Sequence, residues 1–147
     1  MDWMIVYFTR TGNCERIAKK LAETTGYPAL RMIDDVNWSG FFGFMKAGFY
    51  ALTGKRTKIK VEGKLESDRI VLITPIWAGS ITPAAKSFLD HFDPSKVLLV
   101  VMSEVTKPED VYRALKKKYN LLGVHGFNRR VDEDQTIKEL AEKLQRI

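Results

Sequence analysis

The chain has 147 residues, of which 45% are hydrophobic, so it is long and apolar enough to fold as one globular domain and does not read as a disordered segment. No apolar run approaches the roughly 20 residues that a membrane-spanning helix needs, and residues 1–3 lack the basic region of a secretory signal. Cys14 is the single cysteine, which excludes an internal disulfide and leads us to expect a cytoplasmic protein.

Basic residues outnumber acidic ones by 24 to 18, which gives a formal net charge of +6. Such an excess fits a lysine-rich solvated surface, an acidic protein partner or nucleic acid. No basic motif with interleaved aromatic residues is present, so nucleic acid is not expected as a partner. The solvated surface is the simpler interpretation, and an acidic docking partner is the alternative.

The start of the chain predicts a strand, a phosphate-binding turn and a helix. Residues 3–8 are an almost continuous apolar run, typical of a strand that is covered on both faces. Residues 15–23 carry the apolar stripe of an amphipathic helix that stops at Gly26. Between them, residues 9–14 form a hydroxyl-rich turn. Because a helix start has unpaired N–H groups and Gly12 lets the backbone approach a ligand, this turn predicts a phosphate cradle.

The next part of the chain is less regular. Residues 29–33 predict a short second strand at an edge. Residues 41–52 predict a helix that is apolar over much of its circumference, despite glycines that each cost about 1 kcal/mol relative to alanine. Such a helix must be covered by its own domain, or it serves as a flap beside the ligand or as a partner surface. Ile59 and Val61 alternate with lysines in a basic connector and predict a short exposed extended segment.

The third strand is predicted over residues 68–74 and is followed by a loop over residues 75–80. Thr82 then has the position of a helix N-cap, and Pro83 that of a first helical residue. Both residue types are favourable at these positions, so a helix is expected from Pro83 onward.

The end of the chain repeats the pattern. Residues 96–102 predict the fourth strand, and Thr106 caps the helix that follows. Residues 121–127 predict the fifth strand. Asp132 and Gln135 have the spacing of a capping box at the start of the last helix.

Strands and helices thus alternate along the chain, with no change of composition that marks a second domain. This alternation predicts a doubly wound α/β fold, in which helices cover both faces of a parallel sheet. Ligands of such folds bind beyond the carboxyl ends of the strands, at a topological switch point. We therefore expect the ligand at the loops that begin at Thr9, Pro75 and Ser103.

At this point the chain resembles the flavodoxins. The residues that carry the resemblance are Thr9-x-Thr11-Gly12-Asn13-Cys14, similar to the family's phosphate loop Thr/Ser-x-Thr-Gly-x-Thr/Ser, and Thr74-Pro75-Ile76-Trp77-Ala78-Gly79. Alternating strand–helix units over about this length are also typical of short-chain flavodoxins. The resemblance implies one flavodoxin-like domain over residues 1–147, with three layers and a five-stranded parallel sheet of order 2-1-3-4-5.

The resemblance also implies a cofactor, FMN, that is held without a covalent bond and carries one or two electrons. By position, its phosphate would be bound through side chains and backbone by Thr9, Thr11, Asn13 and Cys14, and through the N–H by Gly12. Arg10 either neutralises the phosphate or is simply solvated.

In the second loop, Trp77 would stack on one face of the isoalloxazine ring and exclude water from it. Backbone groups of this loop would hydrogen-bond the ring. The ring-binding residues implied in the second and third loops are Pro75, Ile76, Trp77, Ala78, Gly79, Ser103 and Glu104.

The chain departs from the family in two places. Cys14 replaces the final Thr or Ser of the phosphate loop, and a thiol is a weaker hydrogen-bond donor, so backbone donors should dominate there. The helix start and Arg16 are expected to lower the pKa of this thiol and make it reactive. The loop after the fourth strand also lacks a second aromatic residue, for which Trp38, Phe49 or Tyr50 are candidates.

The predicted function is electron transfer between larger redox proteins, without catalytic residues of the protein's own. The alternatives are an FMN-dependent NAD(P)H or quinone oxidoreductase and a flavin-free interaction module of the same fold. The short chain leaves little room for a separate nicotinamide site, which favours the carrier.

Other proteins with similar patterns fit the chain poorly. A response-regulator receiver needs an aspartate where this chain has Thr74. A low-molecular-weight phosphatase needs an arginine six residues after its phosphate-loop cysteine, where this chain has Lys20. A dinucleotide-binding fold needs three spaced glycines, and Gly12 stands alone. His91 and His125 lack the pattern of metal ligands, so no metal site is expected.

Overall fold

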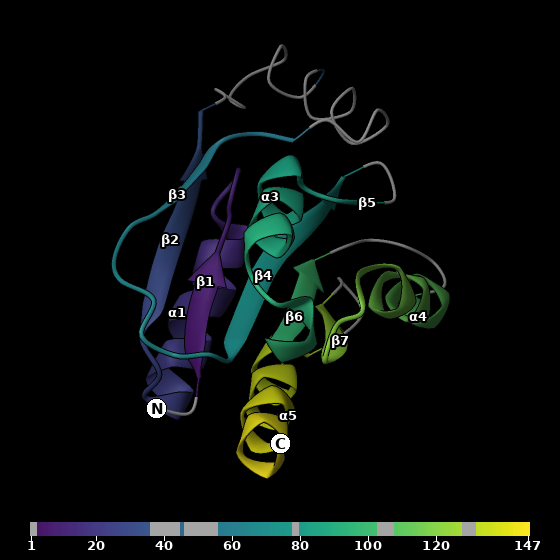
Figure 1. The fold of residues 1–147 in the computed structure, drawn as a ribbon. Helices are drawn as coiled ribbons and strands as arrows, with labels where there is room; N and C mark the ends of the chain where they lie inside the picture. Colours follow the sequence, from purple (N-terminus) through teal and green to yellow (C-terminus); the bar gives the residue numbers. More distant parts are fainter. Residues whose placement is uncertain (1–2, 36–44, 46–55, 78–79, 103–107, 128–131) are drawn as a thin grey trace.

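The computed structural model describes residues 3–35, 45, 56–77, 80–102, 108–127 and 132–147 (Figure 1). Within these residues a seven-stranded sheet forms the centre of the molecule. Its strands are β1 (Met4–Tyr7), β2 (Ala29–Asp34), β3 (Ile59–Val61), β4 (Ile70–Trp77), β5 (Ser80–Ile81), β6 (Val97–Met102) and β7 (Gly123–Phe127). The helices are α1 (Asn13–Thr25), α3 (Pro83–His91), α4 (Pro108–Tyr119) and α5 (Glu133–Arg146), with a 3-10 turn over Pro94–Lys96.

Five of the strands are parallel and lie in the order β2-β1-β4-β6-β7. Numbered along the chain among themselves, they have the order 2-1-3-4-5, so the predicted parallel sheet and its order are confirmed. The predicted count of five strands is wrong for the whole sheet, because β3 pairs antiparallel with β2, and β5 pairs antiparallel with β4.

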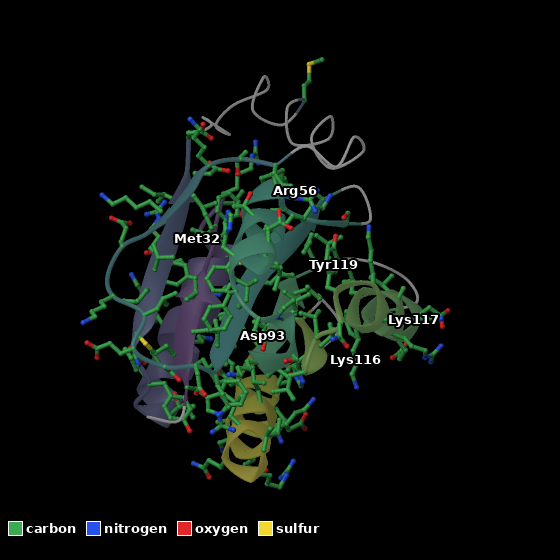
Figure 2. The ribbon with its side chains drawn as sticks, in the orientation of Figure 1. Met32, Arg56, Asp93, Lys116, Lys117 and Tyr119 are labelled. Atoms are coloured by element: carbon green, nitrogen blue, oxygen red, sulfur yellow. The ribbon has the colours of Figure 1, made fainter. Side chains whose placement is uncertain are left out.

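The strand β3 adds an edge to the sheet where the sequence predicts an exposed extended segment. Val61 lies opposite Met32 of β2, a buried residue labelled in Figure 2. Ile59 and Val61 pack against the core, whereas Lys60 between them is exposed. The alternation along β3 therefore places one face of the strand on the core and the other in water.

The loop predicted over residues 75–80 is wrong at both ends, because β4 extends to Trp77 and β5 begins at Ser80. A proline lacks the backbone N–H that a ladder uses, which favours the end of the strand before Pro75. The ladder between β4 and β6 nevertheless continues to Pro75, which lies opposite Met102. The chain then folds back, with Ile76 opposite Ile81 and Trp77 paired with Ser80.

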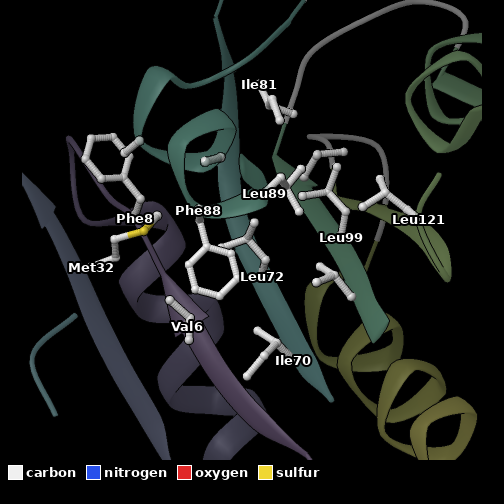
Figure 3. Close-up of a cluster of buried hydrophobic side chains, with 14 of the residues drawn as sticks. Val6, Phe8, Met32, Ile70, Leu72, Ile81, Phe88, Leu89, Leu99 and Leu121 are labelled. Carbon is white, nitrogen blue, oxygen red and sulfur yellow. The ribbon is translucent and has the colours of Figure 1, made fainter. Parts of the chain in front are cut away.

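Alternating side chains of the sheet fill a core on each face. Val6 and Leu72 belong to the core beneath α3 and α4, and Ile5 and Val71 to the core beneath α1 and α5. In Figure 3, Phe88 of α3 lies beside Leu72 in the first of these cores. Burial of each such side chain contributes about 1.5–3 kcal/mol. The two cores give the three layers that the sequence predicts.

Three predicted helix ends are confirmed. Gly26 ends α1 in the left-handed conformation, with a φ of 78°. The side chain of Thr82 caps α3, and Asp132 caps α5 by accepting a hydrogen bond from the N–H of Gln135. The side chain of Gln135 donates to Glu139 on the next turn of α5, so the cap consists of the bond to Asp132.

The predicted helix over residues 41–52 lies outside the described residues, apart from Met45, which is helical and exposed. Trp38, Phe49, Tyr50 and Thr106 lie outside them as well. Among the helices of the described part of the chain, none has the length and apolar character needed to cross a lipid bilayer.

Candidate functional site

Two of the predicted loops begin side by side at the carboxyl ends of β1 and β4, toward the top of Figure 1. Tyr7 lies opposite Ile73, and the N–H of Phe8 donates to the carbonyl of Ile73 at 2.9 Å. The ring of Phe8 meets the ring of Trp77 edge-on, with centroids 5.8 Å apart and planes at 73°. The structure therefore places residues 9–14 next to the end of β4, at the switch point predicted for the ligand.

The turn before α1 is built around Gly12. Its φ of 94° is left-handed, which favours glycine, and nothing lies within 4 Å of where a Cβ would stand. Its N–H donates to Oγ1 of Thr9 at 2.9 Å. No side chain of the described residues caps α1, so the threonines do not serve as the helix cap. The first N–H groups of α1 have no partner within the helix.

The side chains of this turn are linked to one another. Nδ2 of Asn13 donates to Oγ1 of Thr11 at 3.3 Å, and Nη1 of Arg16 donates to Oδ1 of Asn13 at 2.9 Å. Thr11 and Asn13 are exposed, whereas Thr9 and Arg10 are half-buried. The predicted phosphate loop is thus a connected surface turn with hydroxyl, amide and cationic groups.

A group that sequence analysis missed lies beside this turn. Glu133 at the start of α5 accepts from Arg16 Nη2 at 2.7 Å and from Lys20 Nζ at 2.6 Å. Lys20 also bonds Asp134 at 2.9 Å. The Arg16 guanidinium above all, and then the Lys20 ammonium, lower the pKa of Glu133 from 4.5 to about 2. The only sequence signal was an acidic first helical turn.

The exposure and the pKa of the Cys14 thiol differ from those predicted. Its side chain is 2% exposed and belongs to the core beneath α1 and α5. Burial raises the pKa of the thiol to about 12, and this effect outweighs the opposing charge of Arg16. The predicted lowering of the pKa is therefore wrong, because desolvation of the thiolate is the larger effect.

A buried hydrogen bond holds the strand residue that precedes the second loop. Oγ1 of Thr74 and Oγ1 of Thr82 are 2.8 Å apart, and both residues are completely buried, so this hydroxyl pair joins β4 to the start of α3. Pro75, Ile76 and Trp77 follow as half-buried residues. The remaining predicted site residues, Ala78, Gly79, Ser103 and Glu104, lie outside the described residues.

Comparisons with solved structures agree with this topology. A provisionally assigned flavoprotein from Bacteroides eggerthii has a TM-score of 0.75 and 18% identity, with 98% of each chain covered. Another from Bacteroides uniformis has a TM-score of 0.73 and 18% identity, covering 96% of this chain and 97% of that one. The chain has the flavodoxin-like fold.

A third structure with the flavodoxin-like fold is a flavoprotein from Lactobacillus acidophilus in complex with FMN. It has a TM-score of 0.65 and 14% identity, and covers 86% of this chain and 90% of its own. No family model and no curated protein matches the sequence. Identities this low establish a shared fold, so the ligand must be argued from the site itself.

The burial of Cys14 predicts that its thiol is unreactive in the folded protein. A soluble aromatic disulfide reagent should leave the folded protein unmodified at neutral pH, because the thiol is buried and protonated. In denaturant the same reagent should modify the thiol completely, which provides the control. Rapid modification of the folded protein would show that the thiol is accessible, contrary to the structure.

The ion pairs of Glu133 predict a pH dependence of stability. Because its pKa is lowered, the carboxylate stabilises the folded state fully above pH 4.5, and this contribution is lost as the pH falls toward about 2. Urea denaturation of the parent protein and of Glu133→Gln over this range should therefore give a difference in unfolding free energy that shrinks with decreasing pH. A difference that stays constant would contradict the assignment.

Proposed function

We propose that the protein binds FMN without a covalent bond and carries electrons between larger redox proteins. The observation that supports this most is the edge-on contact between Phe8 and Trp77, because it brings a polar helix-start turn and a half-buried indole together at the switch point. A phosphate ester joined to an aromatic ring system matches this pair of neighbours. The flavoprotein from Lactobacillus acidophilus, which has the same fold, is an FMN complex.

The first loop would hold the phosphate. The N–H groups at the start of α1 and the positive end of the helix dipole favour an anion there. Thr9, Thr11 and Asn13 add polar groups, and the open space beside Gly12 leaves the backbone accessible. Because the thiol of Cys14 is buried in the core, this residue would contribute its backbone N–H.

The second loop would hold the ring. Trp77 lies at the end of β4, where pairing with Ser80 and the buried Thr74–Thr82 hydroxyl pair fix the backbone. An indole on one face of the ring excludes water and disfavours negative charge on it. Bound there, FMN supplies a ring system that takes up one or two electrons.

The charge of the surface suggests the kind of redox partner. Lys116 and Lys117 project from α4 (Figure 2), and Arg113 and Lys118 on the same helix are also exposed. A basic surface of this kind speeds the encounter with an acidic one. We therefore propose partners with acidic docking surfaces. The single, buried cysteine accords with a cytoplasmic location.

FMN binding should depend on the ring of Trp77. We expect Trp77→Ala to weaken FMN binding about tenfold or more, because stacking of an aromatic side chain on a base-like ring contributes about 1–3 kcal/mol. Trp77→Phe keeps an aromatic face and should lose less, which makes it the matched control. Fluorescence titration of the flavin-free protein with FMN measures all three affinities.

Equal affinities for the parent protein and Trp77→Ala would remove Trp77 from the ring site. A parent protein that shows no FMN binding would remove the proposed function. Steady oxidation of NADH or NADPH by the isolated FMN-loaded protein would overturn the carrier and favour an oxidoreductase.

A further inference from the structure

A chain of hydrogen bonds runs from α5 across α1 into the phosphate loop. Glu133 accepts from Nε and Nη2 of Arg16, at 3.2 Å and 2.7 Å for the shortest contact of each nitrogen. Nη1 of the same guanidinium donates to Oδ1 of Asn13 at 2.9 Å, and Nδ2 of Asn13 donates to Oγ1 of Thr11 at 3.3 Å. Four side chains from two helices and a loop are thus joined in series.

The series has a direction, because its members differ in what they can donate and accept. An ionised glutamate only accepts, and an arginine only donates. Arg16 must therefore meet the carbonyl oxygen of Asn13, which turns the amide NH₂ toward Thr11. Since Oγ1 of Thr11 accepts this bond, its own O–H proton remains for a group outside the series.

Thr9 is oriented in the same sense by a different group. Its Oγ1 accepts from the backbone N–H of Gly12 at 2.9 Å, which again leaves the O–H proton to donate. Both threonine hydroxyls therefore have an acceptor site filled from within the loop. A loop with this arrangement offers donors to its ligand, and a ligand rich in acceptor oxygens, such as a phosphate monoester, satisfies them.

We propose that Glu133 is a positioning residue of the phosphate loop, which acts through Arg16 and Asn13 to present the Thr11 hydroxyl as a donor to the phosphate. This inference rests on the proposed binding of FMN. It gives a reason for an acidic residue beside an anion site. Two cations, Arg16 and Lys20, offset the charges of Glu133 and Asp134, so the carboxylate orients donors at little electrostatic cost to the ligand.

Asp134 supplies a matched control for Glu133. It lies in the same first turn of α5 and carries the same charge, but its carboxylate contacts Lys20 and belongs to none of the bonds that lead to Asn13. Alanine substitution at either position removes one negative charge near the loop. A role of charge alone predicts that Glu133→Ala and Asp134→Ala tighten phosphate binding alike, whereas positioning predicts opposite behaviour.

The test compares FMN with riboflavin, which lacks the phosphate, in the parent protein, Glu133→Ala and Asp134→Ala. We expect Glu133→Ala to bind FMN about threefold to tenfold more weakly, the effect of one misdirected hydrogen bond. Riboflavin binding should not change in this variant, and Asp134→Ala should bind FMN at least as tightly as the parent. Riboflavin affinity serves as the control, because a general loss of structure would lower it as well.

The proposal is overturned if the two alanine variants have the same ratio of FMN to riboflavin affinity. Should Glu133→Ala fail to fold, Glu133→Leu with Asp134→Leu gives the same comparison, because leucine is larger than alanine and offers no acceptor to Arg16. If the parent protein binds no FMN, the proposed function fails. Titration with inorganic phosphate then tests the positioning role of Glu133. Amide NMR shifts of residues 9–14 that respond to phosphate in the parent and less in Glu133→Ala support the positioning role, and equal responses overturn it.

Discussion

The position of β1 between β2 and β4 determines where the two described loops of the candidate site begin. All three strands are parallel, so the chain leaves β1 and β4 at the same end of the sheet. It then turns to opposite faces, because α1 packs on one core and α3 on the other. The polar turn before α1 and the indole at the end of β4 come from these diverging connections. The topology thus sets the position of the candidate site, and the local sequences supply its functional groups.

The two halves of the site are held by different kinds of interaction. The hydroxyl pair of Thr74 and Thr82 is completely buried and shielded from water. The contacts of Glu133 with Arg16 and Lys20 lie at the surface, where dissolved ions weaken them. The loop proposed for the ring is therefore supported by a contact that solution conditions hardly affect, whereas the support of the loop proposed for the phosphate by α5 responds to ionic strength.

Local patterns predicted the parts of the fold that local physics decides. The five parallel strands and the helix ends at Gly26, Thr82 and Asp132 followed from periodicity and capping, whereas the order of the strands was implied by the resemblance to flavodoxins. The extension of β4 was missed because Pro75 favours the end of a strand, whereas the pairing of β4 with β6 continues to Pro75 and its pairing with β5 continues to Trp77. Tertiary hydrogen bonding, which no single segment encodes, decided that boundary.

The candidate site shows the same division. The proximity of the polar residues in the first loop was predictable because they are contiguous in the chain. Glu133 was not, because it reaches Arg16 from 117 positions away. The error on Cys14 was avoidable, since Cys14, Ile17 and Leu21 have the spacing of one helix face. The helix start and Arg16 were weighed in that prediction, but the apolar stripe that buries the thiol was not.

The strand β3 also affects how the molecule meets other chains. It is three residues long, with Lys60 exposed within it and Lys58 exposed just before it. A foreign strand that paired with this edge would have to bring its own backbone against these ammonium groups and would find few bonds to form. Short, charged edge strands are one way in which natural sheets avoid growing into aggregates. The segment that was expected to be short, exposed and extended thus forms an edge strand whose charges disfavour such growth.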